Sequence, residues 1–515
     1  MVEESRTGER AAPSAGADAP AAVPAREPAD EPERGAPTEP GAPDGPRARA
    51  VRAWHAGRLD PWLLAAVFCA GYAAISVTRW RRWENRSWDL GIFEQVISSY
   101  ARLEAPVSDL KGPGFPILGD HFSPVTALIA PFYRLFPGPV TLLVAQAALF
   151  ALAVVPVTRA AAHFLGRARG AAVGAAFGLS WGIQRAVDFD FHEIAFAVPL
   201  IAFALEAVLR ERWRAALCWA LPLLLVKEDL GLTAAAIACV VALRAGPKDP
   251  RAAKRALAVA AVCVVGCALT LTVVIPSFNA GGEYDYWSKL GESGAEGGGG
   301  GPLGALFTGA EEKLRTLLWI LVPTTGLLAL RSPLLLVALP TMGWRFVSQD
   351  PHYWSTDWHY SAVLMPVLAL ALTDAVARGR SSSRPWLRGY AHHLPAAVLA
   401  AALALSTALP AADLTRAETY RAGPLAAAGE RVMAAVPDGA EVAANVRPIA
   451  HLTQRCRVFW IGGSGDLVPD WIAYYDPGHT AESLTAYAAR LYPQGPRWTV
   501  AAQESGFWVL RAEGS

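Results

Sequence analysis

Acidic, imidazole and aromatic side chains gather in a few short stretches, each beside an apolar segment of the chain. Four of these stretches are RWENRSWDLGIFEQ (82–95), DFDFHE (188–193), KED (227–229) and QDPHYWSTDWHY (349–360). Carboxylates can act as general bases, imidazoles can move protons or bind metals, and lysine can hold phosphate. A charge in hydrocarbon costs at least a few kcal/mol. The pattern therefore predicts a site at one face of a membrane.

Asp89 is the first candidate for chemistry in these stretches. It is flanked by Trp88, Leu90 and Ile92. Tryptophans are common at membrane interfaces, so anchoring explains Trp88 without any function. Anchoring does not explain the carboxylate, which needs a partner, a cation or a reaction; a structural salt bridge is the alternative. Glu94, further along the same stretch, is included as a substrate-binding candidate.

The stretch GDHFSP (119–124) closes the same loop where the chain meets the next apolar segment. Asp120 and His121 could cap that segment, because Asp is a favoured cap residue. They could equally join Asp89, since a histidine beside carboxylates can bind a metal or move a proton. We keep Asp120 as a metal-ligand candidate and His121 as a substrate-binding candidate.

The stretch DFDFHE is a possible cation site between two apolar segments. In an extended backbone Asp188, Asp190 and His192 would face one way, and oxygens with one imidazole suit a hard cation. Asp190, His192 and Glu193 thus join Asp120 as candidate metal ligands. The alternative is a solvated loop, because charges are common in loops.

Two cations and two aromatic groups complete the candidate set. Lys227, in KED, could bind an anionic headgroup such as phosphate, or the three charges could neutralise one another. Arg345 lies within an apolar segment, where a buried guanidinium would require an anion. His359 and Tyr360 open the segment that follows, and both are substrate-binding candidates.

The composition indicates a polytopic membrane protein. Of 515 residues 53% are hydrophobic and only 18% are charged, with a mean hydropathy of +0.27, which is too apolar for an ordinary soluble protein of this length. No basic footprint for nucleic acid is present. Five of the six cysteines lie in apolar segments, so no disulfide framework or metal-ligand spacing follows.

Eleven apolar segments alternate so that Lys/Arg-rich connectors fall on one side and the acidic clusters on the other. The expected spans are 61–78, 139–157, 170–187, 194–209, 215–226, about 230–244, 256–276, 314–330, 333–347, 361–377 and 394–409, with an interfacial segment at 122–136. The positive-inside rule then places the amino terminus in the cytoplasm and the acidic clusters outside.

The expected fold is an all-α polytopic membrane bundle of about 11 helices with a small carboxy-terminal α/β soluble domain. Residues 1–58 read as a disordered cytoplasmic tail, 59–409 as the membrane domain with a large first external loop at 79–121, and 410–515 as an extracytoplasmic domain. Short strands at AEVAANV, CRVFWI, WIAYYD and RWTVAAQ alternate there with helical patterns such as SLTAYAARLY. IGGSGD (461–466) reads as a turn, and GESGAEGGGGG as a linker.

At WDLGIFEQ, GDHFSP and DFHEIAFAVPL the chain resembles a bacterial membrane protein family known as domain of unknown function 2079, over roughly residues 60–480. In architecture that family is similar to the GT-C glycosyltransferases, which use an acidic residue of the first external loop as a catalytic base. The resemblance implies that Asp89 is the base and that Lys227 and Arg345 hold the donor phosphate. Asp190, His192 and Glu193 would bind a divalent cation or orient the acceptor. No Asp-x-Asp stands beside Asp89, so metal dependence is left open.

Together with the polar clusters at one membrane face, this resemblance implies a glycosyltransferase at the outer face of the bacterial cytoplasmic membrane. Its partners would be a polyprenyl-phosphate-linked sugar and membrane lipid, with no nucleic acid. Two alternatives remain: a transporter or flippase for a lipid-linked or anionic substrate, and a non-catalytic membrane scaffold. Transporter sites are expected near the membrane midplane, whereas the polar residues here lie at one face.

Overall fold

The computed structural model describes residues 57–287 and 302–514. The tail expected at 1–58, apart from its last two residues, and the whole Gly-rich linker at 291–301 lie outside the described residues. The described chain is mostly helical and carries a small sheet near its carboxyl end. Both the helical bundle and the sheet are therefore present as expected.

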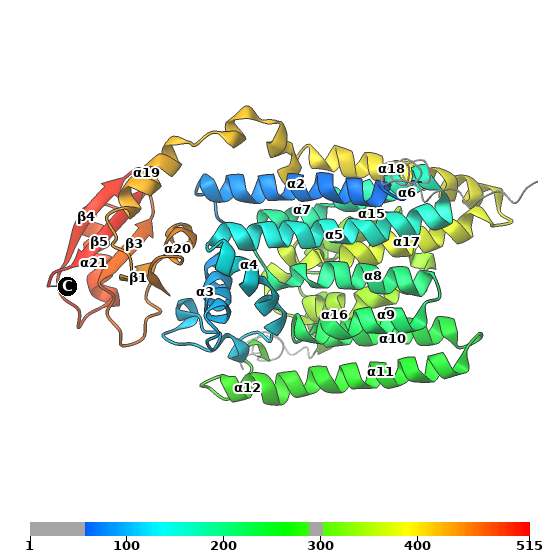
Figure 1. Ribbon diagram of the computed structural model, residues 1–515, viewed down its shortest axis with the longest axis horizontal. Helices are drawn as coiled ribbons and strands as arrows, with labels where there is room; N and C mark the ends of the chain where they lie inside the picture. The colour runs from blue at the N-terminus through cyan, green and yellow to red at the C-terminus, as the bar shows by residue number, and fades with distance from the viewer. Residues whose placement is uncertain (1–56, 288–301, 515) are drawn as a thin grey trace, which may run out of the picture. The chain divides into compact units, whose positions relative to one another are not determined.

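The long helices lie side by side (Figure 1), with contacts between α2 and α5, between α5 and α8 and between α10 and α11. Their bounds, with those of the shorter helices, are α2 Asp60–Arg81, α3 Asp89–Ala101, α4 Ala130–Leu135, α5 Pro139–Leu165, α6 Arg167–Gly178, α7 Trp181–Asp188, α8 Ala197–Leu209, α9 Trp213–Ala220, α10 Leu230–Ala245, α11 Pro250–Leu269, α12 Ile275–Phe278, α14 Pro302–Phe307, α15 Ala310–Thr325, α16 Leu339–Val347, α17 Leu364–Arg380 and α18 Pro385–Ser406.

Short helical turns extend or connect several of these helices. The 3₁₀ turns are η1 Asp109–Lys111, η2 Ile117–Gly119, η3 Pro124–Ile129, η4 Glu193–Ala195, η5 Leu221–Leu225, η7 Asp285–Trp287, η8 Leu328–Arg331, η9 Pro333–Ala338, η10 Pro351–Tyr353, η11 His359–Ser361, η12 Pro410–Thr415 and η13 Ala417–Tyr420; η6 Thr270–Val274 is a π-helical turn.

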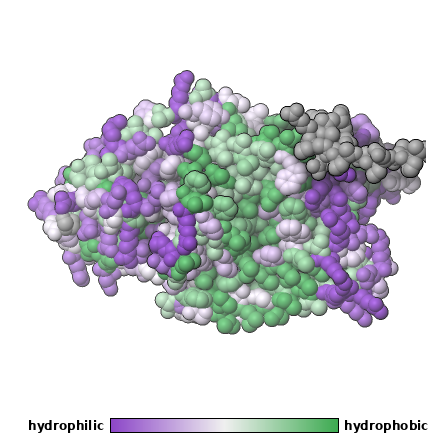
Figure 2. Space-filling view, in the orientation of Figure 1, coloured by the Kyte–Doolittle hydropathy of each residue, from purple (hydrophilic) through white to green (hydrophobic). Residues whose placement is uncertain are grey.

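Four helical stretches of the described chain are long and apolar enough to cross a membrane. They are Asp60–Arg81, Pro139–Leu165, Pro250–Phe278 and His359–Arg380, and three shorter apolar stretches are Trp213–Leu225, Leu230–Ala245 and Pro333–Val347. The predicted number of eleven spans is therefore not confirmed. Apolar side chains cover the helices on the face seen in Figure 2, and hydrophilic side chains gather toward their ends, as a membrane-embedded surface requires.

One expected span, 170–187, is divided into two helices. α6 ends at Gly178, and the backbone of Ser180 is extended before α7 begins. The hydroxyl of Tyr72 donates to the carbonyl oxygen of Gly178 at 2.5 Å, so the break leaves this buried acceptor paired. The break gives α7 its own direction, and α7 ends at Asp188, where the DFDFHE stretch begins.

The carboxy-terminal sheet has the strand order β2-β1-β3-β5-β4. β1 is parallel to both of its neighbours, and β5 is antiparallel to both of its own. The strands are β1 Glu441–Ala444, β2 Arg457–Trp460, β3 Trp471–Tyr475, β4 Trp498–Glu504 and β5 Phe507–Ala512, and the helices are α19 Pro424–Met433, α20 Val446–Leu452 and α21 Ala481–Leu491. Four strands lie where the sequence predicted them; β5 was not predicted.

The sheet region is attached to the loop that precedes α3. The imidazole of His451, in α20, stacks on the ring of Trp83 with centroids 3.5 Å apart, and on Trp80 at 5.0 Å. Trp83 is also part of the apolar cluster that contains Val442 and Phe507. Since flat, closely spaced rings bury apolar area on both sides, this stack joins the sheet to the end of α2.

Candidate functional site

Asp190 fixes the 82–88 loop, the segment that precedes α3. Its carboxylate accepts hydrogen bonds from the backbone N–H groups of Arg86 (3.1 Å) and Ser87 (3.0 Å) and from Nδ2 of Asn85 (3.2 Å). Gln146, in α5, donates to the Asp190 carbonyl at 2.6 Å. Burial raises the pKa of Asp190 to about 6, although these hydrogen bonds oppose the change. Asp190 therefore holds the loop in place.

The cation site predicted in DFDFHE is not assembled by the structure. Asp190 has a φ of 59°, a left-handed conformation that Asp tolerates better than most residues. The turn ends the extended alternation, so Asp188 faces Arg79 and Arg86 instead of lying beside His192.

The other predicted metal ligands also have separate partners. Asp120 lies 3.0 Å from Nζ of Lys111, and Glu193 lies 2.7 Å from Nζ of Lys227. Across residues 57–287 and 302–514, no three His, Cys, Asp or Glu side chains gather where they could hold a metal ion. In the structure Asp120, Asp190, His192 and Glu193 each have a different contact, and metal binding by this set stays a prediction.

Asp89 and His192 form a pair at the start of α3. Nε2 of His192 lies 3.4 Å from Oδ2 of Asp89, and that carboxylate also accepts a hydrogen bond from the hydroxyl of Ser87. The Asp89 side chain is 30% exposed, whereas His192 is only 4% exposed. Burial alone would raise the pKa of Asp89, but the imidazole of His192 and the Ser87 hydroxyl lower it to about 2. Asp89 is therefore an accessible, ionised carboxylate at neutral pH.

A stack of rings leads inward from this pair. The imidazoles of His192 and His359 lie with centroids 3.8 Å apart, and Phe189 covers both at 5.3 and 5.6 Å. The backbone N–H of His192 donates to Oε1 of Gln146 at 3.0 Å. Within the described chain, Nδ1 of His192 and Nδ1 of His359 are buried without a hydrogen-bond partner, whereas Nε2 of His192 faces Asp89. Such atoms are free to bind a polar ligand.

A narrow cleft with about 20 Å³ of free volume adjoins the histidine stack. Its lining consists of Ile194, Lys227, Asp229, Leu230, Thr341, Trp344, His359, Tyr360 and Val363. In the part of the chain that the structure describes, Oδ1 of Asp229 and Nε1 of Trp344 are also buried without a partner. The cleft thus combines one cation with several unpaired polar atoms on an otherwise apolar lining, a common composition for a small-molecule site.

The structure brings together Asp89, His192, Lys227, His359 and Tyr360 of the predicted site residues. Asp229 and Trp344 were not predicted. Asp229 belongs to the KED stretch, which was a usable signal. Trp344 gave no such signal, because tryptophans are common at membrane interfaces.

His121 lies beside this group and is bound by Glu228, which sequence reasoning also left unassigned. Nδ1 of His121 lies 2.9 Å from Oε1 of Glu228, and that carboxylate also accepts from the hydroxyl of Tyr284 at 2.9 Å. Burial and the charge of Lys227 act to lower the pKa of His121, but Glu228 and Asp120 raise it. Glu228 thus joins GDHFSP to KED, two stretches far apart in the sequence.

The structure corrects the argument that a buried Arg345 requires an anion. Arg345 is fully buried, and its guanidinium donates to the carbonyls of Tyr353 (2.8 Å) and Ser355 (2.9 Å) and to the hydroxyl of Ser361 (3.1 Å). Three neutral oxygens satisfy it. Arg345 therefore holds segment 353–361, which carries His359 and Tyr360, and does not point an unpaired charge into the cleft.

Glu94 faces away from the cleft. Its carboxylate accepts hydrogen bonds from the hydroxyls of Tyr133, at 3.1 Å, and Thr453. Burial raises the pKa of Glu94 to about 7, although both hydroxyls act to lower it. Thr453 directly follows α20, so Glu94 joins α3 to the sheet region instead of lining the cleft.

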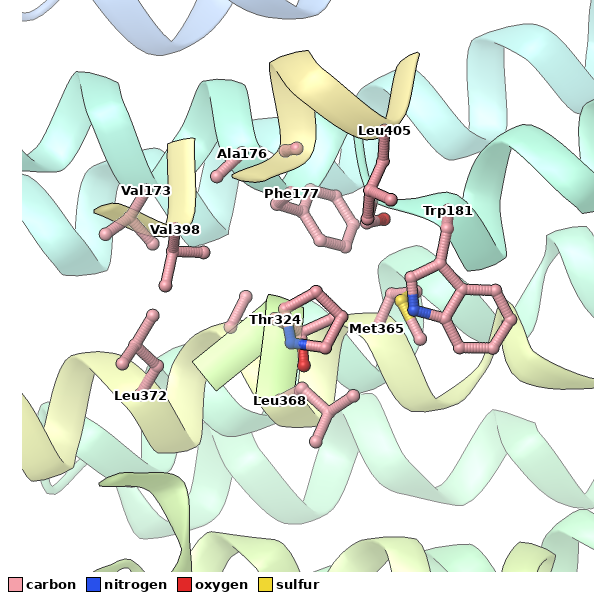
Figure 3. A pocket seen from close by; sticks show the side chains of 14 residues that line it. Val173, Ala176, Phe177, Trp181, Thr324, Met365, Leu368, Leu372, Val398 and Leu405 are labelled. Carbon is pink, nitrogen blue, oxygen red and sulfur yellow. The ribbon is translucent and has the colours of Figure 1, made fainter. Parts of the chain in front are cut away.

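A second, small cavity of about 30 Å³ lies among α6, α7, α15, α17 and α18 (Figure 3). Phe177, Trp181 and Met365 are among the side chains that line it, and its lining includes no titratable group. The cavity therefore offers no acid or base for catalysis.

Comparison with known proteins identifies the family. The family model described as "Predicted membrane protein (DUF2079)" matches residues 84–509. The chain belongs to the DUF2079 family. The match covers the 82–88 loop from Glu84 onward, the cleft and nearly all of the sheet. No curated protein matches this DUF2079 chain.

Solved structures show the fold that this DUF2079 protein shares. ArnT from Cupriavidus metallidurans bound to undecaprenyl phosphate is 13% identical and aligns with a TM-score of 0.50 over 88% of this chain and 98% of its own. The apo state of the same ArnT is 13% identical, with a TM-score of 0.47 over 90% and 98%. The DUF2079 protein, whose family is described as a predicted membrane protein, therefore has an ArnT-like fold.

Proposed function

We propose that the protein is a GT-C-type glycosyltransferase that moves a sugar from a polyprenyl-phosphate donor to an acceptor at the outer face of the cytoplasmic membrane. The observation that carries the proposal is the accessible, ionised Asp89, paired with His192 beside a cleft that contains Lys227. The shared fold supports it, because the ArnT with that fold was crystallised with undecaprenyl phosphate.

Asp89 is the proposed general base. Its carboxylate accepts the proton of an acceptor hydroxyl while the acceptor oxygen bonds to the anomeric carbon of the sugar. The bond from that carbon to the phosphate oxygen breaks, and polyprenyl phosphate leaves with the electron pair. A carboxylate whose pKa is about 2 is a weak base. Proton transfer therefore accompanies bond formation, when the attacking hydroxyl becomes acidic.

Lys227 is the proposed partner of the donor phosphate. Its ammonium carries three N–H groups, of which one donates to Glu193. Glu193 thus orients the cation and leaves two donors for phosphate oxygens. Nε1 of Trp344, buried without a partner among the described residues, supplies a further N–H in the same cleft. Donors held in place before reaction stabilise the charge that develops on the leaving group.

Arg345 acts indirectly in this proposal. By donating to Tyr353, Ser355 and Ser361 it keeps segment 353–361 in place, and with it His359 and Tyr360. Asp190 has the corresponding role for the 82–88 loop. The proposed mechanism contains no step on a metal ion, because each residue predicted to bind one contacts another residue of the protein.

We further propose that residues 59–409 form the membrane domain and 410–515 an extracytoplasmic domain on the same side as Asp89. The stack of His451 on Trp83 and the hydrogen bond between Thr453 and Glu94 support this arrangement, because both contacts join the sheet region to the neighbourhood of α3.

The reaction class can be tested with protein reconstituted in lipid vesicles. Vesicles are loaded with isotopically labelled lipid-linked sugars extracted from bacterial membranes, and an envelope extract supplies acceptors. A transferase moves label out of the lipid fraction and releases polyprenyl phosphate. Movement of intact lipid-linked sugar between leaflets, without release of polyprenyl phosphate, would instead establish a flippase.

A further inference from the structure

A second polar cleft lies at the carboxyl ends of the parallel strands β1, β2 and β3. Its volume is about 400 Å³. Its lining consists of Asn85, Asn445, Val446, Arg447, Trp460, Ile461, Tyr474, Tyr475 and Tyr487. In sheets with parallel strands, ligands bind in the crevice outside the carboxyl ends of the strands. The cleft is thus in the position where this topology places a binding site.

The lining offers aromatic faces together with neutral polar groups. The rings of Tyr474 and Tyr487 lie with centroids 5.9 Å apart, and Trp460 is on the same lining. Within the described residues, the hydroxyls of Tyr474 and Tyr487 make no hydrogen bond. Tyrosine and tryptophan present an apolar face with a polar edge, which matches a ligand that has both.

Asn85 supplies a second, independent sign of a ligand. The residue is only 6% exposed, and its Nδ2 donates to Asp190. Its Oδ1 is buried without a hydrogen-bond partner within the described residues, and Asn85 lines this cleft. A buried acceptor without a partner is costly, and a ligand hydroxyl in the cleft would satisfy it.

The charge of the lining favours a neutral ligand. The lining includes no carboxylate, and its one cation is Arg447. That guanidinium donates to the carbonyl of Trp83 at 2.9 Å and lies over the ring of Tyr475 at 4.3 Å. Because Arg447 is already engaged by the protein, the cleft has little net attraction for an anion.

We propose that this cleft binds a neutral saccharide chain and presents one of its hydroxyls to Asp89. A sugar ring has an apolar face for the aromatic rings and hydroxyls for Asn85, Tyr474 and Tyr487. The second part of the proposal rests on the proposed transferase function. Its geometric basis is Trp88, the neighbour of Asp89, whose ring contacts that of Trp460 at 4.9 Å.

A peptide is the less suitable ligand. Extended peptides usually bind by adding a strand to an open sheet edge. β1 and β3 are each paired on both sides, and the cleft lies at the strand ends, so its walls offer side chains in place of an unpaired strand.

The test uses full-length protein in lipid nanodiscs, passed over immobilised oligomannoside, oligogalactoside and oligoarabinoside, with aromatic and Gly/Ser-rich hexapeptides on the same surface. The variant Tyr474→Phe/Tyr487→Phe keeps both rings and removes both hydroxyls. The matched control, Tyr390→Phe/Tyr420→Phe, removes two hydroxyls that bind backbone carbonyls outside the cleft.

We expect wild-type protein to bind at least one saccharide and neither peptide. The cleft variant should bind about tenfold more weakly, the loss of two neutral hydrogen bonds, and the control should match the wild type. Retention on no saccharide, equal retention by the cleft variant, or retention on the peptides would overturn the proposal. Saccharide binding requires no transfer, so a protein that binds but never transfers would refute the proposed function alone.

Discussion

The proposed role of Asp89 depends on residues that position it and take no part in the reaction. Asp190 and Gln146 hold the 82–88 loop and the backbone of His192, so the carboxylate and imidazole meet at 3.4 Å. The sequence pointed to Asp89, Lys227, His359 and Tyr360, because charged or polar groups beside apolar segments stand out. It could not show that Arg345 is satisfied by carbonyl oxygens, since backbone acceptors leave no pattern in the side-chain sequence.

At the residue scale, Lys227→Gln should raise the KM for the lipid-linked donor by roughly tenfold to a hundredfold. The reason is the loss of a charge-assisted hydrogen bond to phosphate, worth about 1.5–3 kcal/mol. Lys248→Gln is the control, because Lys248 is exposed and paired with Glu211. The KM is measured by titrating the lipid-linked donor against reconstituted protein. An unchanged KM in Lys227→Gln would exclude Lys227 from donor binding.

At the scale of elements, α3 has two separate tasks. Asp89 is the first residue of α3 and lies toward the cleft. Glu94 faces Tyr133 and Thr453 and joins the helix to the sheet region. Sequence proximity suggested one shared site for both carboxylates. Five residues along a helix are a rotation of about 500°, which places the second carboxylate roughly 140° around the axis from the first.

Glu94 should make the stability of this junction depend on pH. Its pKa in the folded protein, about 7, lies above the ordinary value of 4.5, so the folded state binds the proton more tightly. The contribution of Glu94 to the free energy of unfolding is therefore complete below about pH 4.5 and is lost as the pH rises through about 7. Wild-type thermal midpoints should fall between about pH 5 and about pH 8, whereas those of Glu94→Gln should change less.

Glu104→Gln is the control for that measurement, since Glu104 is exposed and paired with Arg102. It should follow the wild-type pH dependence. A Glu94→Gln profile parallel to that of the wild type would show that Glu94 does not titrate in this range.

At the scale of the whole molecule, the sequence predicted the bundle and the sheet, whereas its prediction of eleven membrane spans is not confirmed. Hydropathy marks apolar segments, and it cannot show where a segment stops being one helix. Gly178 and Ser180 divide one expected span because Tyr72 supplies an alternative partner for a helix carbonyl. Pro222 lies in η5, the 3₁₀ turn that brings the chain to Lys227.

The contacts make a topological prediction about the whole chain. Nε2 of His192 lies 3.4 Å from Oδ2 of Asp89. Reporter fusions after the 82–88 loop and after Glu193 should therefore both report the extracytoplasmic side. Fusions in the connector 381–384, in a region that contains Arg378, Arg380, Arg384 and Arg388, should report the cytoplasm, in keeping with the positive-inside rule. Opposite locations for the first two fusions would be incompatible with the proposed site.

The most direct test of the account is the transfer rate of Asp89→Asn. The amide keeps the shape of the side chain but cannot accept the proton, so transfer of labelled sugar from the lipid-linked donor should fall by at least about a hundredfold. Glu104→Gln, an exposed carboxylate of the same loop region, should transfer like the wild type, and both variants should insert normally. Wild-type transfer by Asp89→Asn would contradict the assignment of Asp89 as the base.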